Sequence, residues 1–543
     1  MRAGALLAIA LAASPAEPEG PAGAVPAAEA DAGAGASPDA GVDAGALAAE
    51  PIESFEPFEP LARPSPAPDA GAGPGSGPGS PDEEPGLTRA WAELTGLGAL
   101  DTWFDPPPST GTPEDILESQ LRVDLGADIR LGKAGRMVLE ARTRLRYLAR
   151  AGLDRLRGGA EMRPGGVFVD VYGRWADLRI GWQRIPLGAN VLLSPPADAL
   201  NPRDLREGFF STAGDPESSV LSVLAVRAQG ELGPVRWLVA YVPFFEPHRY
   251  AVFGQDQALL QPAAEVALPF EVDPTIEERL QEHLLETARP GDLGTSGDLA
   301  VRARVDLGRG HAGAGWLWGN EKLPQVKVDP ELFAALKAQS LGRAVDPAIL
   351  LSLQNRIAAG ESLYQGTYAR QHIFWLEGSA ILGPAQLDVD LAYSPERTFG
   401  TDALATVRLP TFTWMIGATP AQDSNPAYSA GYMGMAVPGV PADEVLFPLE
   451  PGTARGAAHT AFFHLLVVAG SRKFLDGKLE VRGGLAFEVV QRSFFFGPQV
   501  SYEVWPRVRI GAALERYTGP PSSPFGYFDR NDRALVSVVW TPR

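Results

Sequence analysis

A regular alternation of apolar and polar residues over Gln120–Arg150 constrains the fold of this 543-residue chain more than any other feature. A period of two is the pattern of β-strands with one apolar and one polar face, and two strands fit here, joined at Lys133-Ala134-Gly135. One face of the hairpin is predicted to carry Leu121, Val123, Leu125, Ala127, Ile129, Leu131, Leu139, Ala141, Thr143, Leu145, Tyr147 and Ala149. The other face is predicted to carry Gln120, Arg122, Asp124, Asp128, Arg130, Glu140, Arg142, Arg144, Arg146 and Arg150.

Two environments suit such a hairpin. In a soluble β-sandwich the apolar face meets a second sheet and the polar face meets bulk water. In an outer-membrane barrel the apolar face meets lipid and the charged face lines a wet lumen. The strand count, the loop lengths and the tryptophan positions bear on the choice.

The alternation continues through most of the chain after Leu94 and predicts eighteen strands, or sixteen if one hairpin is dropped. The expected strands are Leu94–Phe104, Gln120–Leu131, Met137–Arg150, Val167–Ala176, Leu178–Leu187, Ser219–Glu231, Arg236–Phe244, Leu299–Leu307, Ala312–Gly319, Tyr368–Ile381, Gln386–Tyr393, Ala403–Arg408, Thr411–Thr419, Thr460–Gly470, Lys478–Val490, Gly497–Val504, Val508–Tyr517 and Ala534–Trp540.

The connections between these strands fall into two classes. Short turns include Lys133-Ala134-Gly135, Leu409-Pro410, Leu475-Asp476-Gly477 and Trp505-Pro506. Every long connection follows an odd-numbered strand, so all of them project from one side, as in membrane barrels. The long connections are Asp105–Ser119, Gly188–Ser218, Phe245–Asp298, Asn320–Gln365, Ala421–His459 and Gly519–Arg533.

Short helices are expected within two of the long connections. Asp273-Pro274, Asp329-Pro330 and Asp346-Pro347 each place an N-cap aspartate before a proline suited to the first helical turn. We expect these helices at the rim or mouth of the barrel. Tryptophans on or near strand ends suggest interfacial girdles, although each could singly be a core residue: Trp103, Trp175, Trp182, Trp237, Trp375, Trp505 and Trp540.

The N-terminal region differs in composition from the rest of the chain. Residues 1–13 resemble a short secretory signal peptide, with an Ala-rich helix as the alternative. Ser14–Gly86 contains 14 acidic residues and one arginine, for a net charge of −13 out of −19, and its composition predicts a disordered segment. The predicted barrel covers residues 87–543. No later stretch approaches the roughly 18 apolar residues of a membrane helix.

The sequence contains no catalytic or metal-binding signature. It has no cysteine, and no His-Glu-x-x-His, Gly-x-Ser-x-Gly or P-loop motif. The six histidines are scattered, at His248, His283, His311, His372, His459 and His464. We therefore expect no cofactor, no metal and no enzymatic activity, and the acidic balance argues against a nucleic-acid partner.

Leu178–Arg206 carries a more specific pattern. It reads Arg179-Ile180-Gly181-Trp182-Gln183, followed by Asp198-Ala199-Leu200-Asn201-Pro202-Arg203-Asp204. This resembles the strand-to-loop signature of porin-like outer-membrane barrels of Gram-negative bacteria, namely the alginate-export-like group and a related uncharacterised outer-membrane family. Two features depart from that pattern. Leu187-Gly188 replaces a Trp-Gly pair, and Thr541-Pro542-Arg543 follows the last strand.

The resemblance implies a location in the cell outer membrane, insertion by the barrel-assembly machinery and a loop that folds into the lumen. That constriction loop would contain Asp198, Asn201, Pro202, Arg203, Asp204 and Arg206. An ordinary exposed loop with local Asx turns is the alternative. The expected pore-lining residues are Arg122, Asp124, Asp128, Arg130, Arg142, Arg144, Arg146, Arg179, Gln183, Arg302, Arg304, Asp388, Asp390, Glu480 and Arg482. Their arginines either favour anions or neutralise the carboxylates and stiffen the wall.

Three functions remain open at this point. The first is a porin-like channel for passive passage of small hydrophilic solutes, including anions. The second is a non-conducting outer-membrane surface barrel whose long loops bind partners or polymers. The third is a soluble, secreted β-protein.

Overall fold

The computed structural model describes residues 86–101, 116–131, 135–150, 157–189, 199–205, 219–249, 296–340, 344–359, 361, 363–400, 406–420, 425–442, 446, 450–451, 458–520, 523–529 and 532–541. All of them belong to one of two compact units of the chain, Pro64–Arg543. The predicted signal peptide, residues 1–13, and almost all of the acidic segment Ser14–Gly86 lie outside the described residues.

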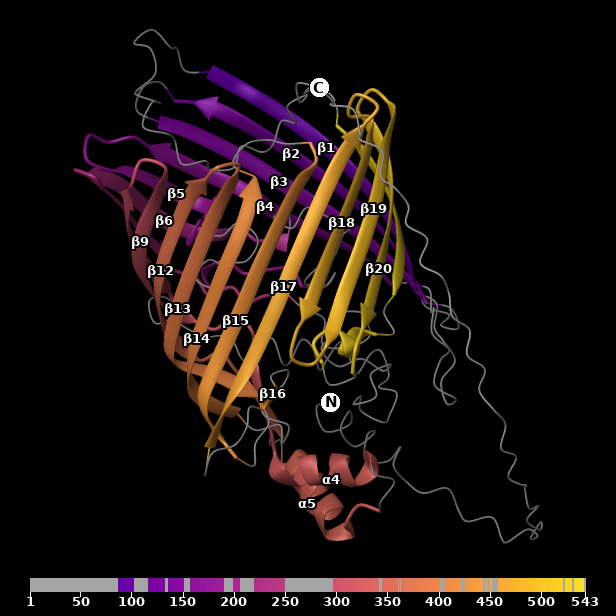
Figure 1. Ribbon diagram of the computed structural model, residues 1–543. Coiled ribbons are helices and arrows are strands. Elements are labelled where there is room, and N and C mark those ends of the chain that lie inside the picture. The colour runs from indigo at the N-terminus through magenta and orange to yellow at the C-terminus, as the bar shows by residue number, and fades with distance from the viewer. Residues whose placement is uncertain are drawn as a thin grey trace, which may run out of the picture. The chain divides into compact units, whose positions relative to one another are not determined.

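Eighteen antiparallel strands form a closed barrel, in which each strand pairs with its sequence neighbour and β1 pairs with β21 (Figure 1). This confirms the predicted all-β fold class. The strands are β1 (Gly86–Asp101), β2 (Ile116–Arg130), β3 (Gly135–Arg150), β4 (Arg157–Val171), β5 (Asp177–Gln183), β6 (Val223–Leu232), β7 (Val235–Val242), β8 (Asp298–Asp306), β9 (Gly310–Asn320), β12 (Arg370–Leu382), β13 (Ala385–Gly400), β14 (Thr406–Pro420), β15 (Ala427–Pro441), β17 (Ala458–Phe474), β18 (Leu479–Glu488), β19 (Ser493–Trp505), β20 (Val508–Thr518) and β21 (Arg533–Trp540). A two-residue strand, β16 (Glu450–Pro451), also pairs with β17.

Short turns and long connections lie at opposite ends of the barrel. The turns at Gly233-Pro234 and Gly383-Pro384 each use a glycine with φ of 60°, a conformation that lets two antiparallel strands join through two residues. Connections of tens of residues follow β5, β7 and β9 at the other end. In outer-membrane barrels the short-turn end faces the periplasm and the long-loop end faces the outside.

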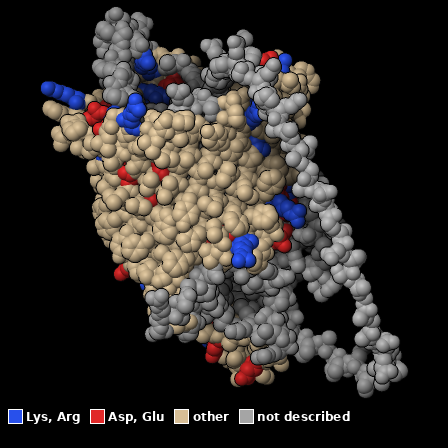
Figure 2. All heavy atoms as spheres, viewed as in Figure 1, with Lys and Arg blue, Asp and Glu red and all other residues tan. Residues whose placement is uncertain are grey.

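The alternation seen in the sequence separates the two surfaces of the wall. Leu125 and Leu139 are 52% and 39% exposed, whereas Asp124, next to Leu125 in β2, is 7% exposed. Uncharged residues dominate the visible outer wall (Figure 2). A closed barrel with an apolar outer surface suits a bilayer, so the expected outer-membrane location is confirmed and a soluble sandwich is excluded. Among the described residues, no helix is long and apolar enough to span a membrane.

The predicted strand number is correct because two errors cancel. Thr406–Arg408, the described part of the predicted strand Ala403–Arg408, and Thr411–Thr419 belong to the single strand β14, so Leu409-Pro410 is not a turn. A strand that was not predicted, β15, lies within the expected long connection Ala421–His459. Pro410 fits inside a strand because it lies opposite a register shift between Ser394 and Arg397 of β13, where a ladder hydrogen bond is already missing.

The expected tryptophan girdle is only partly correct. Trp175, Trp505 and Trp540 are exposed at the short-turn end. Trp375, in contrast, is 2% exposed and points into the barrel from the middle of β12. Trp103 lies outside the described residues.

Two of the predicted helices are present, in the connection after β9. They are α4 (Pro330–Ser340) and α5 (Pro347–Ala358), and the small hairpin of β10 (Gln325–Val328) and β11 (Tyr364–Thr367) carries them. Asp329 accepts hydrogen bonds from the amides of Glu331 and Leu332, and Asp346 from that of Ala348, as N-caps do. The helix expected at Asp273-Pro274 lies outside the described residues.

Candidate functional site: an arginine pocket beneath an inward loop

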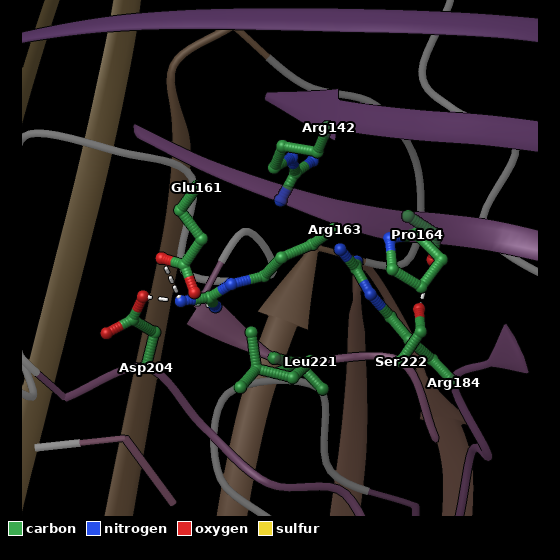
Figure 3. Close-up of a pocket in the computed structure, with 10 residues that line it drawn as sticks. Arg142, Glu161, Arg163, Pro164, Arg184, Asp204, Leu221 and Ser222 are labelled. Atoms are coloured by element: carbon green, nitrogen blue, oxygen red, sulfur yellow. Dashed lines mark hydrogen bonds and ion pairs between the residues drawn. The ribbon is translucent and has the colours of Figure 1, made fainter. Parts of the chain in front are cut away.

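A small pocket lies on the inward side of the barrel wall (Figure 3). Its wall side comes from the middle of β3 and β4, so the pocket lies near mid-height. Its other side comes from the connection between β5 and β6. The lining residues are Arg142, Glu161, Arg163, Pro164, Gly165, Arg184, Asp204, Val220, Leu221 and Ser222.

Two arginines lie side by side on the wall of this pocket. Arg142 of β3 and Arg163 of β4 are cross-strand partners. Like charges at such positions repel, so this pair needs carboxylates or a bound anion nearby. A register shift in β4 beside Pro164-Gly165 bends the strand next to Arg163, and the side chain of Glu140 fills the space that Gly165 leaves.

Carboxylates from three elements hold these arginines. The Nε of Arg142 donates to Asp124 at 2.8 Å, and Asp124 also lies 3.2 Å from Arg122. Arg163 donates to Glu161 at 2.5 Å and to Asp204 at 3.3 Å. These pairings support the interpretation that part of the arginine charge is neutralised within the wall.

The segment that carries Asp204 folds inward, and Asn201 ties its two ends together. The side-chain amide of Asn201 accepts a hydrogen bond from the Ile185 amide at 2.9 Å and donates one to the Ile185 carbonyl at 2.8 Å. The backbone of Asp204 pairs in parallel with Arg249, and that of Arg203 pairs with Val220. Asn201, Pro202, Arg203 and Asp204 are all buried. These contacts hold residues 199–205 against neighbouring elements of the barrel, while a role of this loop as a constriction stays a prediction. Asp198 and Arg206 lie outside the described residues.

His248, in the connection after β7, supports the same segment. Its Nδ1 accepts a hydrogen bond from the Arg203 amide at 2.8 Å, which requires an unprotonated nitrogen. Burial, followed by the positive charges of Lys322, Arg203 and Arg397, lowers the pKa of His248 to about 3. His248 is therefore neutral at physiological pH.

An apolar patch on the inner wall provides a seat for the same loop. Ile185, Leu187 and Leu200 of the loop are nearly or completely buried against it. The seat consists of Val223, Ala225, Leu238, Ala240, Val242, Ala300, Leu317, Ile373, Trp375 and Ala392. Ala189 of the loop also donates to Asp390 of β13 at 2.8 Å, so the loop extends along the inner wall as far as β13. The apolar seat was not predicted, because alternation alone assigns the inward face to polar residues.

Two further apolar patches receive other connections. Phe525 and Phe528, between β20 and β21, pack with Met415, Leu465, Phe495 and Tyr517. Leu446, between β15 and β17, packs with Phe399, Val437, Val440 and Ala461. Three connections thus cover inward faces from β6 round to β20. The charged inward faces of β3 and β4 carry the pocket.

The residues expected to line the pore occupy inward positions, but only one of them lines this pocket. Arg142 does so. Arg179 is paired with Asp170 at 2.6 Å, and Glu480 with Arg482 and Arg509 at 2.6 and 3.0 Å. For Arg144 and Arg146 the structure describes the backbone alone, opposite Arg122 and Gln120. The remaining members of the set share the inward face: Arg122, Asp124, Asp128, Arg130, Gln183, Arg302, Arg304, Asp388 and Asp390.

Several charged residues of the site were not predicted. Glu161 and Arg163 alternate as inward residues should, but Pro164-Gly165-Gly166 interrupts the pattern and hid the first half of β4. Arg249 forms an ion pair with Glu161 from a loop, where periodicity gives no signal. In the described part of the chain, no group of three or more His, Cys, Asp or Glu residues could hold a metal ion.

Neither a family model nor the sequence of a curated protein matches this chain. Among solved structures it is similar to OccAB3 of Acinetobacter baumannii, with 11% identity, 83% of this chain and 99% of that chain covered, and a TM-score of 0.40. It is also similar to OccK5 (OpdH) of Pseudomonas aeruginosa, with 10% identity, 84% of this chain and 99% of that chain covered, and a TM-score of 0.41. A third similar structure is a loop L8 deletion mutant of OmpT, an outer membrane protein of Vibrio cholerae. Its identity is 10%, 85% of this chain and 100% of that chain are covered, and the TM-score is 0.34. Likenesses of this size say nothing about the solute. The architecture itself is that of a porin-like outer-membrane β-barrel.

Proposed function

We propose that this protein is a channel for the passive passage of small hydrophilic solutes, with a preference for anions. The observation that carries the proposal is the pocket at mid-height, where Arg142, Arg163 and Arg184 converge beside an inward loop. Barrels of 16 to 18 strands are wide enough for an aqueous channel, and inward loops narrow such a channel to a selective constriction.

The charge of the pocket supports an anion preference. Three arginines and two carboxylates, Glu161 and Asp204, line it, so the lining carries a net charge of +1. A positive lining raises the local concentration of anions and lowers that of cations. We propose that the solute path passes the charged inward faces of β3 and β4 beside this pocket. We propose no enzymatic activity and no cofactor.

Two measurements test this proposal. Refolded protein in a planar bilayer should give steps of ionic current, and a salt gradient across the bilayer should give a reversal potential on the anion side. Replacing Arg142, Arg144 and Arg146 by glutamine should shift that potential toward cations. Arg309→Gln, in a turn at the short-turn end, is the matched control. No shift in the triple variant would mean that these arginines only stiffen the wall.

The second candidate is a non-conducting surface barrel whose long loops bind partners. The helices α4 and α5 favour it, because a separate hairpin, β10–β11, carries them outside the barrel sheet. Val328 and Tyr364 pair at the end of that hairpin, so residues 329–363 can be replaced by Asn-Gly without breaking a barrel strand. A wild type that stays closed, and a variant that also stays closed, would favour the surface barrel over the channel.

The proposed partners follow from the fold. Outward leucine, valine and aromatic side chains suit the outer-membrane bilayer. We propose that the barrel-assembly machinery recognises β21, where Trp540 is 45% exposed. Removal of Thr541-Pro542-Arg543 should then leave insertion into outer-membrane vesicles unchanged, whereas Trp540→Ser should reduce it.

A further inference from the structure

Asp204 is the residue of the inward loop that contacts an arginine of the pocket wall. Its side chain is 3% exposed, and its carboxylate is 3.3 Å from the guanidinium of Arg163. Arg163 belongs to the barrel wall and also binds Glu161, which in turn pairs with Arg249. Glu161 is therefore a carboxylate of the wall, whereas Asp204 is a carboxylate that the loop brings to the wall.

The backbone around Asp204 fixes this arrangement. Its amide donates to the Ser219 carbonyl at 2.7 Å, and the Leu205 amide donates to the Arg249 carbonyl at 2.6 Å. The side chain is thus held against Arg163 by main-chain bonds on both sides. Any anionic group that binds the guanidinium of Arg163 from the pocket must compete with a carboxylate that is already in place.

We propose that Asp204 is a specificity-determining residue, whose carboxylate occupies Arg163 in place of the anionic group of a solute and so weakens anion binding. This inference rests on the proposed channel function. A conducting pore must bind an ion well enough to admit it and weakly enough to release it. With Asp204 ionised the pocket lining carries +1, and without that charge it carries +2. Asp204 thus keeps three converging arginines from trapping an anion.

Asp204→Asn keeps the shape of the side chain and removes its charge. In a planar bilayer with a KCl gradient, the ratio of anion to cation permeability should rise roughly threefold, as expected for one unit charge at contact distance in a wet, salt-screened pore. Inorganic phosphate, added as a probe, should block the variant for longer than the wild type. The longer phosphate block should disappear in an Arg163→Gln background, because the guanidinium for which Asp204 and phosphate compete is then absent.

Asp170→Asn is the matched control. It also removes one buried inward carboxylate, which pairs with Arg179 outside the pocket. The control should change the permeability ratio by less than half as much. Heat-modifiable migration on gels verifies that each variant has folded into a barrel.

A second readout separates this inference from the channel proposal. Phosphate should raise the Tm of Asp204→Asn more than that of the wild type, whether or not either conducts. If the wild type conducts no current but this difference in Tm is present, the channel proposal is refuted, whereas the competition of Asp204 for Arg163 is supported. Higher conductance for both ions at an unchanged ratio would show that Asp204 only straps the loop to the wall. A longer phosphate block that persists in Arg163→Gln would likewise overturn the proposal.

Discussion

The indole of Trp375 occupies the space that Gly315 leaves on the inward face of the barrel. The two residues are direct partners across β9 and β12, and a methyl group at Gly315 would overlap the indole ring. Trp375 also donates from its Nε1 to Glu377 at 3.2 Å. The glycine therefore allows a large side chain to complete the apolar seat of the inward loop.

Gly315→Ala should destabilise the barrel by about 1–3 kcal/mol, because a rigid ring must move in a packed interior. The free energy of unfolding in denaturant measures this cost. Gly484→Ala is the control, since nothing lies within 4 Å of a methyl group there. Adding Trp375→Phe should recover part of the loss, and equal losses at Gly315 and Gly484 would contradict this account.

Leu200→Ala should loosen the inward loop. Leu200 is completely buried in the seat, and such truncations cost about 2–5 kcal/mol locally. Amide exchange in residues 199–205 should accelerate, and open-channel current noise should increase. Leu232→Ala, at a side chain that is 74% exposed, should change neither quantity. Unaltered exchange in Leu200→Ala would show that the backbone bridges alone hold the loop.

The stability of the loop should fall as the pH drops from about 6.5 toward 3. The folded protein keeps His248 neutral because its pKa is lowered to about 3, whereas the unfolded chain takes up a proton near the ordinary value of 6.5. Linkage then costs up to about 1.4 kcal/mol per pH unit within that window. His248→Gln should flatten the pH dependence of the free energy of unfolding, and His372→Gln should not. A slope that survives in His248→Gln would assign it to other groups.

The α4–α5 pair should also weaken in acid, but at lower pH. Arg356 lies within 2.7 Å of both Asp329 and Glu361, and its hydrogen bonds lower the pKa of each carboxyl below its ordinary value of 3.8 or 4.5. This stabilisation is complete above those values and is lost as the pH falls through the lowered ones.

Arg356→Gln should remove that acid sensitivity and increase proteolytic cleavage between α4 and α5 at neutral pH. Limited proteolysis across pH 3 to 7 measures both effects. Arg309→Gln, in a turn between β8 and β9, should behave as the wild type does. Equal cleavage of the two variants would show that the ion pairs contribute nothing to the helical pair.

The strands that the sequence predicted best are those with charges on one face only. In β2 and β3, arginine and aspartate alternate with leucine and valine, because one side meets lipid and the other meets polar groups. In β15 both faces are apolar or small, since Met433 and Met435 point toward interior clusters while Tyr428 and Tyr432 point outward. The alternation of apolar and polar residues disappears when both faces of a strand meet apolar surroundings, so β15 was not predicted.

The sequence by itself determined an all-β chain of strands, its two classes of connection and the polar face of its first strands, because these follow from local alternation and turn residues. Only the tertiary structure decided where the connections go. The seat of Leu200, the contact of Asp204 with Arg163 and the pairing of Glu161 with Arg249 join residues far apart in the chain. Such contacts depend on barrel closure and on shape complementarity between loop and wall, neither of which is expressed in the spacing of neighbouring residues.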